Sequence, residues 1–177
     1  MNILQNLICL GFTTLLVNSP TLADQICQRD GIPQLLSNSR FSYDTQNVVI
    51  DNRTGLMWAT CVDGLNGEQC ESGTPTLFTW GEALQRATEI NENKGLANHK
   101  DWRLPNIREL TTLIDTQCLK PSIDMKSFPN TPASHTWTSS PYHTLTFYSW
   151  YVDFARGETN TDDRLNKKVI RFVRNVR

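Results

Sequence analysis

The sequence DWRLPNIREL at residues 101–110 contains the best-marked local structure in the chain. Asn106 is a residue type favoured at the N-terminal cap of a helix, and Glu109 stands three residues later, where its carboxylate can bond back to the cap. This pair predicts a helix that begins after Asn106. Apolar residues then recur at helical spacing as far as Cys118, and Pro121 blocks any continuation.

Trp102 and Arg103 in the same stretch are interpreted as structural residues. Tryptophan is highly buried on average, so we expect Trp102 in the core. We expect Arg103 to pair with a carboxylate, and Pro105 to lead into the helix start.

Residues 79–93 predict the other helix of the chain. Thr79 is a capping residue and Glu82 follows three residues later, which is the same cap pattern. Apolar side chains recur through the segment near the helical period, so one face of this helix is expected to be buried.

Strand signals lie on both sides of the helical region. The runs Asn47–Ile50 and Leu56–Ala59 are joined by a turn that contains Asp, Asn and Gly, which predicts a β-hairpin. Toward the C-terminus, strands are predicted at Thr136–Ser140, Tyr148–Ala155 and Lys168–Val176. This order favours an α+β fold in which two helices pack on an antiparallel sheet.

The first 23 residues contain no charged side chain, and their apolar stretch is followed by Pro20 and Ala23. This pattern predicts a signal peptide at residues 1–23 that is removed on export, although no Lys or Arg precedes the apolar part. A buried N-terminal helix or a short membrane anchor is the alternative, but the stretch is too short to span a bilayer. Export implies the periplasm or the extracellular space, with no stable membrane span after cleavage.

Removal of the signal peptide takes away Cys9, one of the five cysteines. The remaining Cys27, Cys61, Cys70 and Cys118 allow three disulfide connectivities. We favour Cys61–Cys70, which closes a short loop rich in Gly and Asn, and this choice leaves Cys27–Cys118. Four free thiols or a zinc site are the alternatives, but no C-x-x-C spacing supports zinc.

The chain of 177 residues carries 17 Lys and Arg against 18 Asp and Glu, and 38% of its residues are hydrophobic. This composition is typical of one globular domain and argues against bulk binding to nucleic acid. Residues 164–177, here called the basic strip, nevertheless contain six basic residues and no acidic one. Lys167, Lys168 and Arg174 are its expected surface members and candidate contacts for a sulfated or acidic polysaccharide, whereas Arg171 is expected to be buried and paired with a carboxylate.

Aromatic residues gather between the last turn and the final strands. Such rings stack on the apolar faces of sugars, while flanking polar groups bond the hydroxyls. The ligand-binding candidates are Tyr142, His143, Tyr148 and Tyr151, and Trp137 and Trp150 are expected in the core. Burial of the tyrosines is the alternative.

Glu158, Asp162 and Asp163 lie in a polar segment that we interpret as a loop. Oxygen donors at this density suit Ca²⁺, but the spacing lacks the glycine and the final glutamate of an EF-hand. A solvated loop, without calcium or another cofactor, is therefore the favoured interpretation.

Catalytic patterns are missing from the sequence. The three histidines lack metal-ligand spacing, and neither a G-x-S-x-G segment nor a Gly-rich phosphate loop occurs. Disulfide bonding of the four mature cysteines leaves no thiol nucleophile. We therefore expect a protein that is not an enzyme.

Seven segments resemble one known family: DNRTGLMW (51–58), TWGEAL (79–84), DWRLPNIREL (101–110), PSIDMKSFPNTP (121–132), WTSSPY (137–142), WYVDFARG (150–157) and VIRFVRNV (169–176). Their order and spacing are similar to the Legionella collagen-like protein C-terminal (Lcl C-terminal) family of exported bacterial domains. The resemblance implies a C-type-lectin-like fold over residues 47–177, after a lead-in at residues 24–46. The Glu-Pro-Asn and Trp-Asn-Asp segments of calcium-dependent lectins are missing, so calcium-dependent sugar binding is not carried over.

These observations predict an exported, non-enzymatic binding module for adhesion to, or recognition of, a surface polysaccharide or an envelope protein. The adhesin that gives the family its name supports attachment by analogy only. A structural accessory subunit of a cell-envelope or appendage assembly is the second hypothesis. A periplasmic hydrolase is the third and weakest, because no nucleophile or metal set is recognisable.

Overall fold

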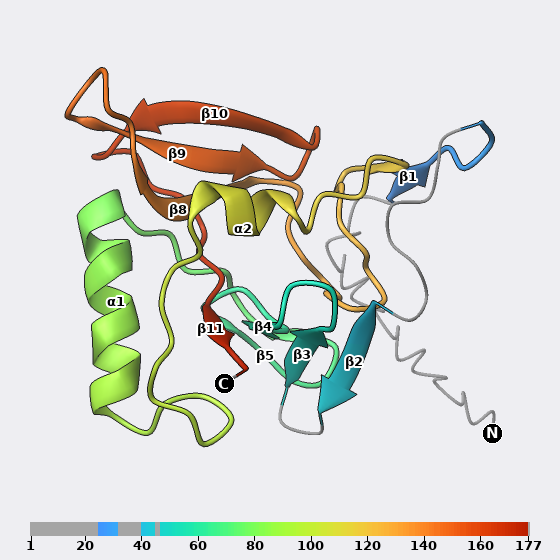
Figure 1. The fold of residues 1–177 in the computed structure, drawn as a ribbon, viewed down its shortest axis with the longest axis horizontal. Helices are drawn as coiled ribbons and strands as arrows, with labels where there is room; N and C mark the ends of the chain where they lie inside the picture. Colours follow the sequence, from blue (N-terminus) through green and yellow to red (C-terminus); the bar gives the residue numbers. More distant parts are fainter. Residues whose placement is uncertain (1–24, 32–39, 45–46, 177) are drawn as a thin grey trace, which may run out of the picture.

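The computed structural model describes residues 25–31, 40–44 and 47–176 (Figure 1). The predicted signal peptide at residues 1–23 and part of the lead-in lie outside these described residues. The described part has an α+β fold with two helices, antiparallel sheets and two disulfides, as the sequence predicts. Neither of the two helices seen there is long and apolar enough to cross a membrane.

One antiparallel sheet has four strands in the order β11-β4-β3-β2. The strands are β2 (Phe41–Asp44), β3 (Val48–Asp51), β4 (Leu56–Ala59) and β11 (Val173–Asn175). β3 and β4 form the predicted hairpin. Gly55 ends its turn with a φ of 68°, an angle that a residue with a Cβ rarely adopts.

A second antiparallel sheet, at the top of Figure 1, has three strands in the order β10-β9-β8. They are β8 (His135–Pro141), β9 (Tyr148–Asp153) and β10 (Glu158–Asp163). β10 corrects the sequence analysis, which placed this acidic segment in a loop. Four of its six residues are Glu, Asn or Asp, which have weak β propensity, but all six pair with β9 and so extend the sheet.

Two short strand pairs lie beside the disulfides. β1 (Ile26–Cys27) pairs with β7 (Cys118–Leu119), and β5 (Leu65–Asn66) pairs with β6 (Ser72–Gly73). The favoured connectivity is confirmed, because Cys27 bonds Cys118 and Cys61 bonds Cys70. The chain-entropy description of cross-links assigns about 4.6 kcal/mol of stabilisation to the long bridge and about 2.7 kcal/mol to the short one.

Both predicted helix starts are confirmed. The helices are α1 (Trp80–Glu92) and α2 (Ile107–Thr111), and each begins with a capping box. The cap pairs are Thr79 with Glu82 and Asn106 with Glu109. Each box satisfies backbone N–H groups that a helix start would otherwise leave unbonded.

α2 ends much earlier than the expected position near Cys118. It has five residues and is followed by tight turns, in which Leu113 donates to Leu110 and Ile114 donates to Thr111. Ile114 then forms a backbone bridge with Ile123. Pairing with this distant segment therefore replaces a further helical turn.

Trp102 and Arg103 have the predicted structural roles. Trp102 is 2% exposed, and its indole N–H donates to the carbonyl of Leu96 at 2.9 Å. The two terminal nitrogens of Arg103 donate to the two carboxylate oxygens of Glu109, at 2.7 and 2.8 Å. The same glutamate also accepts from the backbone N–H of Asn106, so one carboxylate fixes both the helix cap and the arginine.

Residues 168–176 pass between the elements of both sheets. Their backbone bonds reach separate parts of the fold, among them Phe78 before α1, His135 and Trp137 of β8, Ala59 of β4, and Arg103 before α2. Only Val173–Asn175 forms a regular strand, which corrects the single strand predicted over Lys168–Val176. The bonding partner changes every one to three residues, so most of the segment makes single bridges.

Arg171 anchors this segment in the core, where its residue exposure is 1%. Its guanidinium donates to the carbonyl oxygens of Ala59, at 2.7 Å, and Thr60, and to the hydroxyl of Thr131, at 2.7 Å. The burial was predicted, but the expected carboxylate partner was wrong, because these neutral oxygens surround the charge instead. Burial lowers the pKa of Arg171 to about 9, so the group remains protonated at neutral pH.

Replacing Arg171 with Met is expected to lower the free energy of unfolding by at least about 3 kcal/mol, because three buried acceptors lose their donor and each costs about 1–3 kcal/mol. Urea denaturation measures the difference. Arg53→Met is the control at an exposed arginine, with an expected change within about 0.5 kcal/mol. A loss below about 1 kcal/mol for Arg171→Met would contradict the anchoring role.

Asp51 and Arg40 form a second buried contact, with 2.5 Å between Oδ2 and Nη2. Burial alone would raise the pKa of Asp51. Hydrogen bonds from Arg40 and Thr54, the charge of Arg40 and the backbone N–H of Arg53 outweigh burial and hold the pKa below its ordinary 3.8. The ion pair therefore stabilises the fold at pH values at which the Asp51 carboxyl is ionised in the unfolded chain.

This shift predicts a specific loss of stability in acid. The contribution of Asp51 is fully present above about pH 4 and disappears as the pH falls through the lowered folded pKa. Urea denaturation is expected to give similar unfolding free energies at about pH 7 and about pH 5, and a falling value below about pH 4. Asp51→Asn should make that fall shallower, while Glu92→Gln, at an exposed position, should leave it unchanged. An equally steep fall in Asp51→Asn would contradict the assignment.

Candidate functional site

The register of the three-stranded sheet brings one side chain from each strand to the same face. Tyr151 of β9 lies opposite Trp137 of β8 and Asn160 of β10. Directly opposed residues share a face, so all three side chains lie on the same side of the sheet. Trp150, the next residue along β9, belongs to the other face.

Tyr151 is surrounded by ring and charge contacts. Its ring centroid lies 4.6 Å from that of His135 and 6.1 Å, edge to face, from that of Trp137. Burial raises the pKa of the Tyr151 phenol, and the negative charges of Asp162 and Asp153 raise it further. The phenol is therefore a neutral hydroxyl at physiological pH.

Lys168 lies beneath this ring system and not at the surface. Lys168 is 4% exposed, and its Nζ is 2.5 Å from a carboxylate oxygen of Asp162. The same Nζ lies 4.7 Å from the ring centroid of Trp137 and 4.4 Å from that of Tyr151. The prediction of a surface ligand contact at Lys168 was therefore wrong. Burial alone would raise the pKa of Asp162, but the hydrogen bond from Lys168 and other bonds hold it below its ordinary value.

Arg174 was also predicted at the surface and is 7% exposed. Its Nε donates to Asp101 at 2.7 Å, and its Nη1 contacts the sulfur of Met57 at 3.6 Å. The hydrogen bond from Arg174 lowers the pKa of Asp101. Arg174 is thus part of an ion pair at the edge of the four-stranded sheet.

The remaining described members of the basic strip do not form a continuous positive surface. The guanidinium of Arg164 lies 4.2 Å from the ring centroid of Trp80 and donates to the hydroxyl of Ser149 at 2.9 Å. Lys167 is exposed, as predicted, and Arg177 lies outside the described residues. The strip therefore contributes structural contacts at most of its cations.

A cleft of about 410 Å³ opens on the face that carries Tyr151. It is lined by Ala133, His135, Tyr151, Asp153, Ala155, Arg156, Glu158 and Asn160. The lining thus combines a ring pair, tilted by 40° between the planes of His135 and Tyr151, with two carboxylates, a guanidinium and an amide. We call it the sheet cleft.

Asp153 is held in a fixed orientation in the sheet cleft. Its exposure is 8%, and its Oδ1 accepts from the backbone N–H of Ala155 at 2.8 Å. Its Oδ2 lies 3.7 Å from Nε2 of His135, which is longer than a hydrogen bond. A nearly buried carboxylate that lines a cleft in this way is preorganised to accept a hydrogen bond from a bound molecule.

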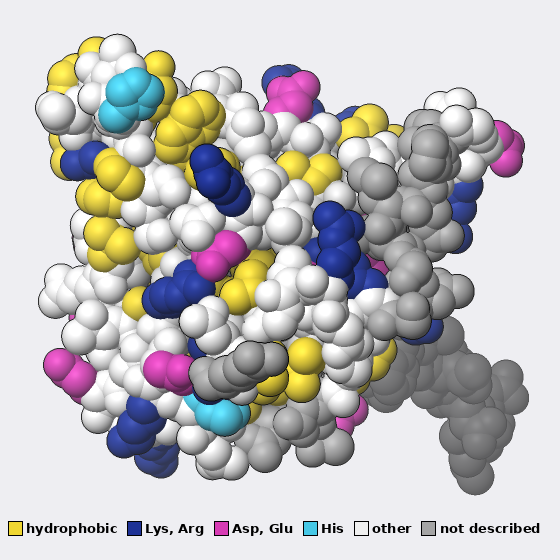
Figure 2. Space-filling view, in the orientation of Figure 1, with side chains coloured by type: hydrophobic (Ala, Val, Ile, Leu, Met, Phe, Trp, Pro, Cys, Tyr) yellow, Lys and Arg dark blue, Asp and Glu magenta, His cyan; other side chains and the backbone are white. Residues whose placement is uncertain are grey.

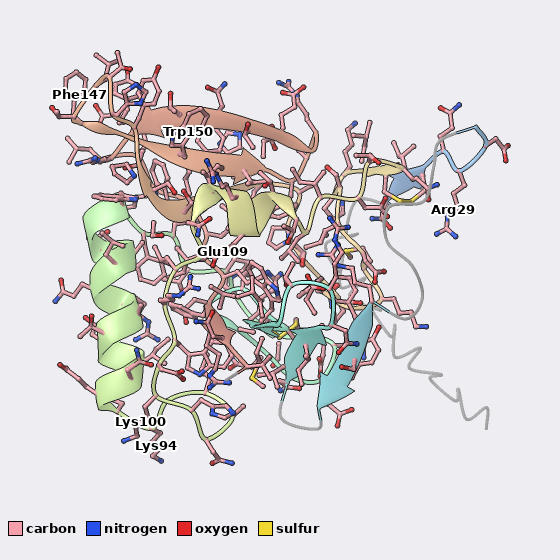
Figure 3. The ribbon with its side chains drawn as sticks, in the orientation of Figure 1. Arg29, Lys94, Lys100, Glu109, Phe147 and Trp150 are labelled. Carbon is pink, nitrogen blue, oxygen red and sulfur yellow. A yellow bond between two sulfur atoms is a disulfide. The ribbon has the colours of Figure 1, made fainter. Side chains whose placement is uncertain are left out.

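The predicted candidates Tyr142, His143 and Tyr148 lie elsewhere, around the loop that joins β8 to β9. Tyr142 contacts His143 and Trp150 edge to face, at 5.5 Å in each case. Phe147 is 57% exposed and Leu145 is 42% exposed. Figure 2 shows hydrophobic side chains gathered at this end, and Figure 3 labels Phe147 there and Trp150 farther along β9. The structure therefore separates these three residues, which belong to the hairpin tip (residues 142–148), from Tyr151 in the sheet cleft.

Trp137 is fully buried, as predicted, whereas Trp150 is only partly buried. Trp150 was expected in the core, and the difference follows from its face of the sheet. Val152 on that face packs into the core, while Trp150, two residues away toward the hairpin tip, packs against Tyr142.

The acidic residues of β10 are not gathered around one point. Glu158 and Asp162 are four residues apart on an extended strand, a separation of about 13 Å. Asp163 follows on the opposite face, and Asp162 is bonded by Lys168 and Asn166. Within the described ranges, no three His, Cys, Asp or Glu residues lie close enough to hold a metal ion.

Most of the cleft was missed by the sequence analysis. His135, Asp153 and Asn160 come from three different strands, and they meet only when β10 pairs with β9. Because β10 was taken for a loop, no alignment of these residues was predicted. In the sequence, Trp150, Val152 and Phe154 alternate with Tyr151 and Asp153, and this alternation indicates that Tyr151 and Asp153 share one face of the strand.

The chain matches a known protein family. A model described as the Lcl C-terminal domain matches residues 47–174, which is well over half of the chain. The match extends from β3 into β11, so it includes both helices and the whole sheet cleft. A search of curated proteins found no match.

The neighbours Lys167 and Lys168 provide a direct test of the buried ion pair. Brief treatment with an amine-acetylating reagent, followed by peptide mass spectrometry, is expected to label Lys167 at least about ten-fold faster, because a buried amine reacts only on local opening. Lys168→Ala should lower the unfolding free energy by about 1–3 kcal/mol through loss of the ion pair and the cation–π contacts. Lys167→Ala should change it by less than about 0.5 kcal/mol. Equal labelling of the two lysines would contradict the burial of Lys168.

Proposed function

We propose, from the premise that this chain belongs to the Lcl C-terminal domain family, that it is an exported, non-enzymatic binding module with a C-type-lectin-like fold. Its ligand is a surface polysaccharide, which it recognises in the sheet cleft. The polysaccharide contacts the paired rings of Tyr151 and His135 and the polar side chains around them.

The composition of the sheet cleft is the observation that carries this proposal. Saccharide sites combine apolar ring surface, which takes the C–H faces of a sugar, with a few fixed polar groups that bond its hydroxyls. The ring pair of Tyr151 and His135 supplies the first element. Asp153, Asn160 and Arg156 supply acceptors and donors for the second.

The position of Tyr151 favours rigid recognition. Its ring is held by contacts with Trp137 and with the ammonium of Lys168, which is itself paired with Asp162. A ring fixed before the ligand arrives loses little conformational entropy on binding. This arrangement supports a binding role for a side chain that is partly buried.

Two further features support export and a non-catalytic role. Disulfides form and persist in oxidising compartments such as the periplasm and the extracellular space. Cys27, Cys61, Cys70 and Cys118 are all disulfide-bonded, so none of them can serve as a thiol nucleophile. Binding is therefore the better-supported activity for this fold.

The hairpin tip favours a second candidate function, that of an accessory subunit in an envelope or appendage assembly. Phe147 and Leu145 are exposed there, and a convex apolar tip suits insertion into a pocket of another protein subunit. In that case Phe147→Ser should abolish co-purification of a stoichiometric partner. It should not affect glycan binding in the sheet cleft.

A glycan array probed with the disulfide-bonded mature protein tests the leading proposal. We expect the protein to be retained on at least one glycan class. His135→Ala should weaken this glycan binding at least about ten-fold, because half of the ring pair is removed. Phe147→Ser should leave the glycan binding unchanged. These two variants are matched, since each removes one exposed ring, His135 from β8 and Phe147 from the hairpin tip that follows it. An array on which no glycan is retained at low or high salt would overturn the proposal.

A further inference from the structure

We infer that the ligand of the sheet cleft is an uncharged, hydroxyl-rich sugar unit, and that sulfated and acidic glycans are excluded from it. This inference rests on the proposed function and adds the chemical class of the ligand. It also reverses the expectation, drawn from the basic strip, of an anionic polysaccharide.

The charges that line the sheet cleft are mixed in sign. Asp153 and Glu158 contribute carboxylates, and Arg156 contributes a guanidinium. The two carboxylates outnumber the single guanidinium, so the charges of the lining disfavour an anionic ligand. A neutral ligand with several hydroxyls satisfies both kinds of group, because each hydroxyl both donates and accepts.

Asp153 is placed as the acceptor for such hydroxyls. The backbone N–H of Ala155 fixes its Oδ1, and its Oδ2 is too far from His135 to be fully bonded. A carboxylate with fixed orientation accepts charge-assisted hydrogen bonds from sugar hydroxyls, which are stronger than neutral ones. A sulfate group has no hydrogen to donate at this position.

Asn160 is placed as a donor on the neighbouring strand. Its side-chain oxygen accepts from the backbone N–H of Thr161 at 2.8 Å. With the oxygen engaged in this way, the NH₂ group is the part of Asn160 that can donate to a ligand. The sheet cleft therefore presents an oriented acceptor on β9 and an oriented donor on the neighbouring strand β10.

The cations that would attract a polyanion have other partners. Lys168 is paired with Asp162, Arg174 is paired with Asp101, and Arg171 is buried in the core. Binding to sulfated polymers depends on exposed Lys and Arg and weakens steeply with salt. Among the described members of the basic strip, Lys167 is exposed and the other cations are held in contacts within the fold. The described part of the strip therefore offers little of that attraction, and glycan binding in the sheet cleft is expected to be insensitive to salt.

Titration of the mature protein with three classes of soluble glycan tests this inference. The probes are a neutral oligosaccharide panel, heparin and polygalacturonate, each measured by calorimetry at about 0.05 M and about 0.5 M NaCl. We expect binding to at least one neutral oligosaccharide, with an affinity that changes less than about two-fold between the two salt concentrations. Heparin and polygalacturonate should bind at least about ten-fold more weakly.

Variants on β10 locate the site. Asn160→Ala and Glu158→Gln replace exposed side chains of the cleft, and Asn160→Ala is expected to reduce the affinity for the neutral sugar at least about ten-fold. Glu158→Gln removes one repelling charge and should strengthen any residual binding of polygalacturonate. Thr159→Ala is the matched control, because Thr159 is exposed on the same strand but on the opposite face.

The outcomes separate this inference from the proposed function. Binding that is confined to heparin or polygalacturonate and falls with salt would overturn the inference and leave polysaccharide recognition intact. Neutral-sugar binding that Asn160→Ala leaves unchanged would also overturn it. An absence of binding to all three probe classes would remove the proposed function itself.

Discussion

The structure depends on a buried guanidinium that holds the C-terminal segment in place. Arg171 donates to two carbonyl oxygens at the end of β4 and to the hydroxyl of Thr131, and its side chain is almost completely buried. Burying a charge without a counterion is costly unless its donors are satisfied. These bonds tie residues 168–176 to the four-stranded sheet, while the backbone of the same segment bonds β8 and the start of α1. The segment therefore joins the two sheets.

The path of that segment also decides what the surface offers. Two cations that the sequence placed at the surface are drawn inward by it: Lys168 under the rings of Trp137 and Tyr151, and Arg174 against Asp101. What stays open is the face of β8, β9 and β10 beyond Lys168. There the exposed groups carry charges of both signs, so the same packing that stabilises the fold selects a neutral ligand.

Features that depend on neighbours in sequence were predictable. The capping boxes of α1 and α2 lie within four residues, and the hairpin of β3 and β4 has its turn residues in place. The short Gly- and Asn-rich loop favoured the Cys61–Cys70 disulfide among three possible connectivities, and this choice left Cys27 with Cys118. Features that depend on pairing between distant segments could not be predicted in this way. β10 has a composition typical of a loop and becomes a strand only beside β9, and α2 stops because Ile114 pairs with Ile123. Arg174 meets its carboxylate 73 residues away, which no local pattern indicates.

The candidate site follows the same division. The aromatic character of the region was visible in the sequence, and so was the placement of Tyr151 and Asp153 on one side of β9. The set of residues that line the sheet cleft was not visible in the sequence. Tyr142 and Tyr148 belong to the hairpin tip, while His135 and Asn160 join Tyr151 from the neighbouring strands. A binding site built across three strands is defined by register, and register is set by the pairing of the whole sheet.

Ligand binding on the Tyr151 face of the three-stranded sheet can be tested by an NMR titration of the isotopically labelled mature protein with the best-binding neutral oligosaccharide. We expect shift changes confined to the backbone of Asp153–Asn160 and to the rings of His135 and Tyr151. Changes centred on the hairpin tip at Leu145 and Phe147, with none in the sheet cleft, would contradict it.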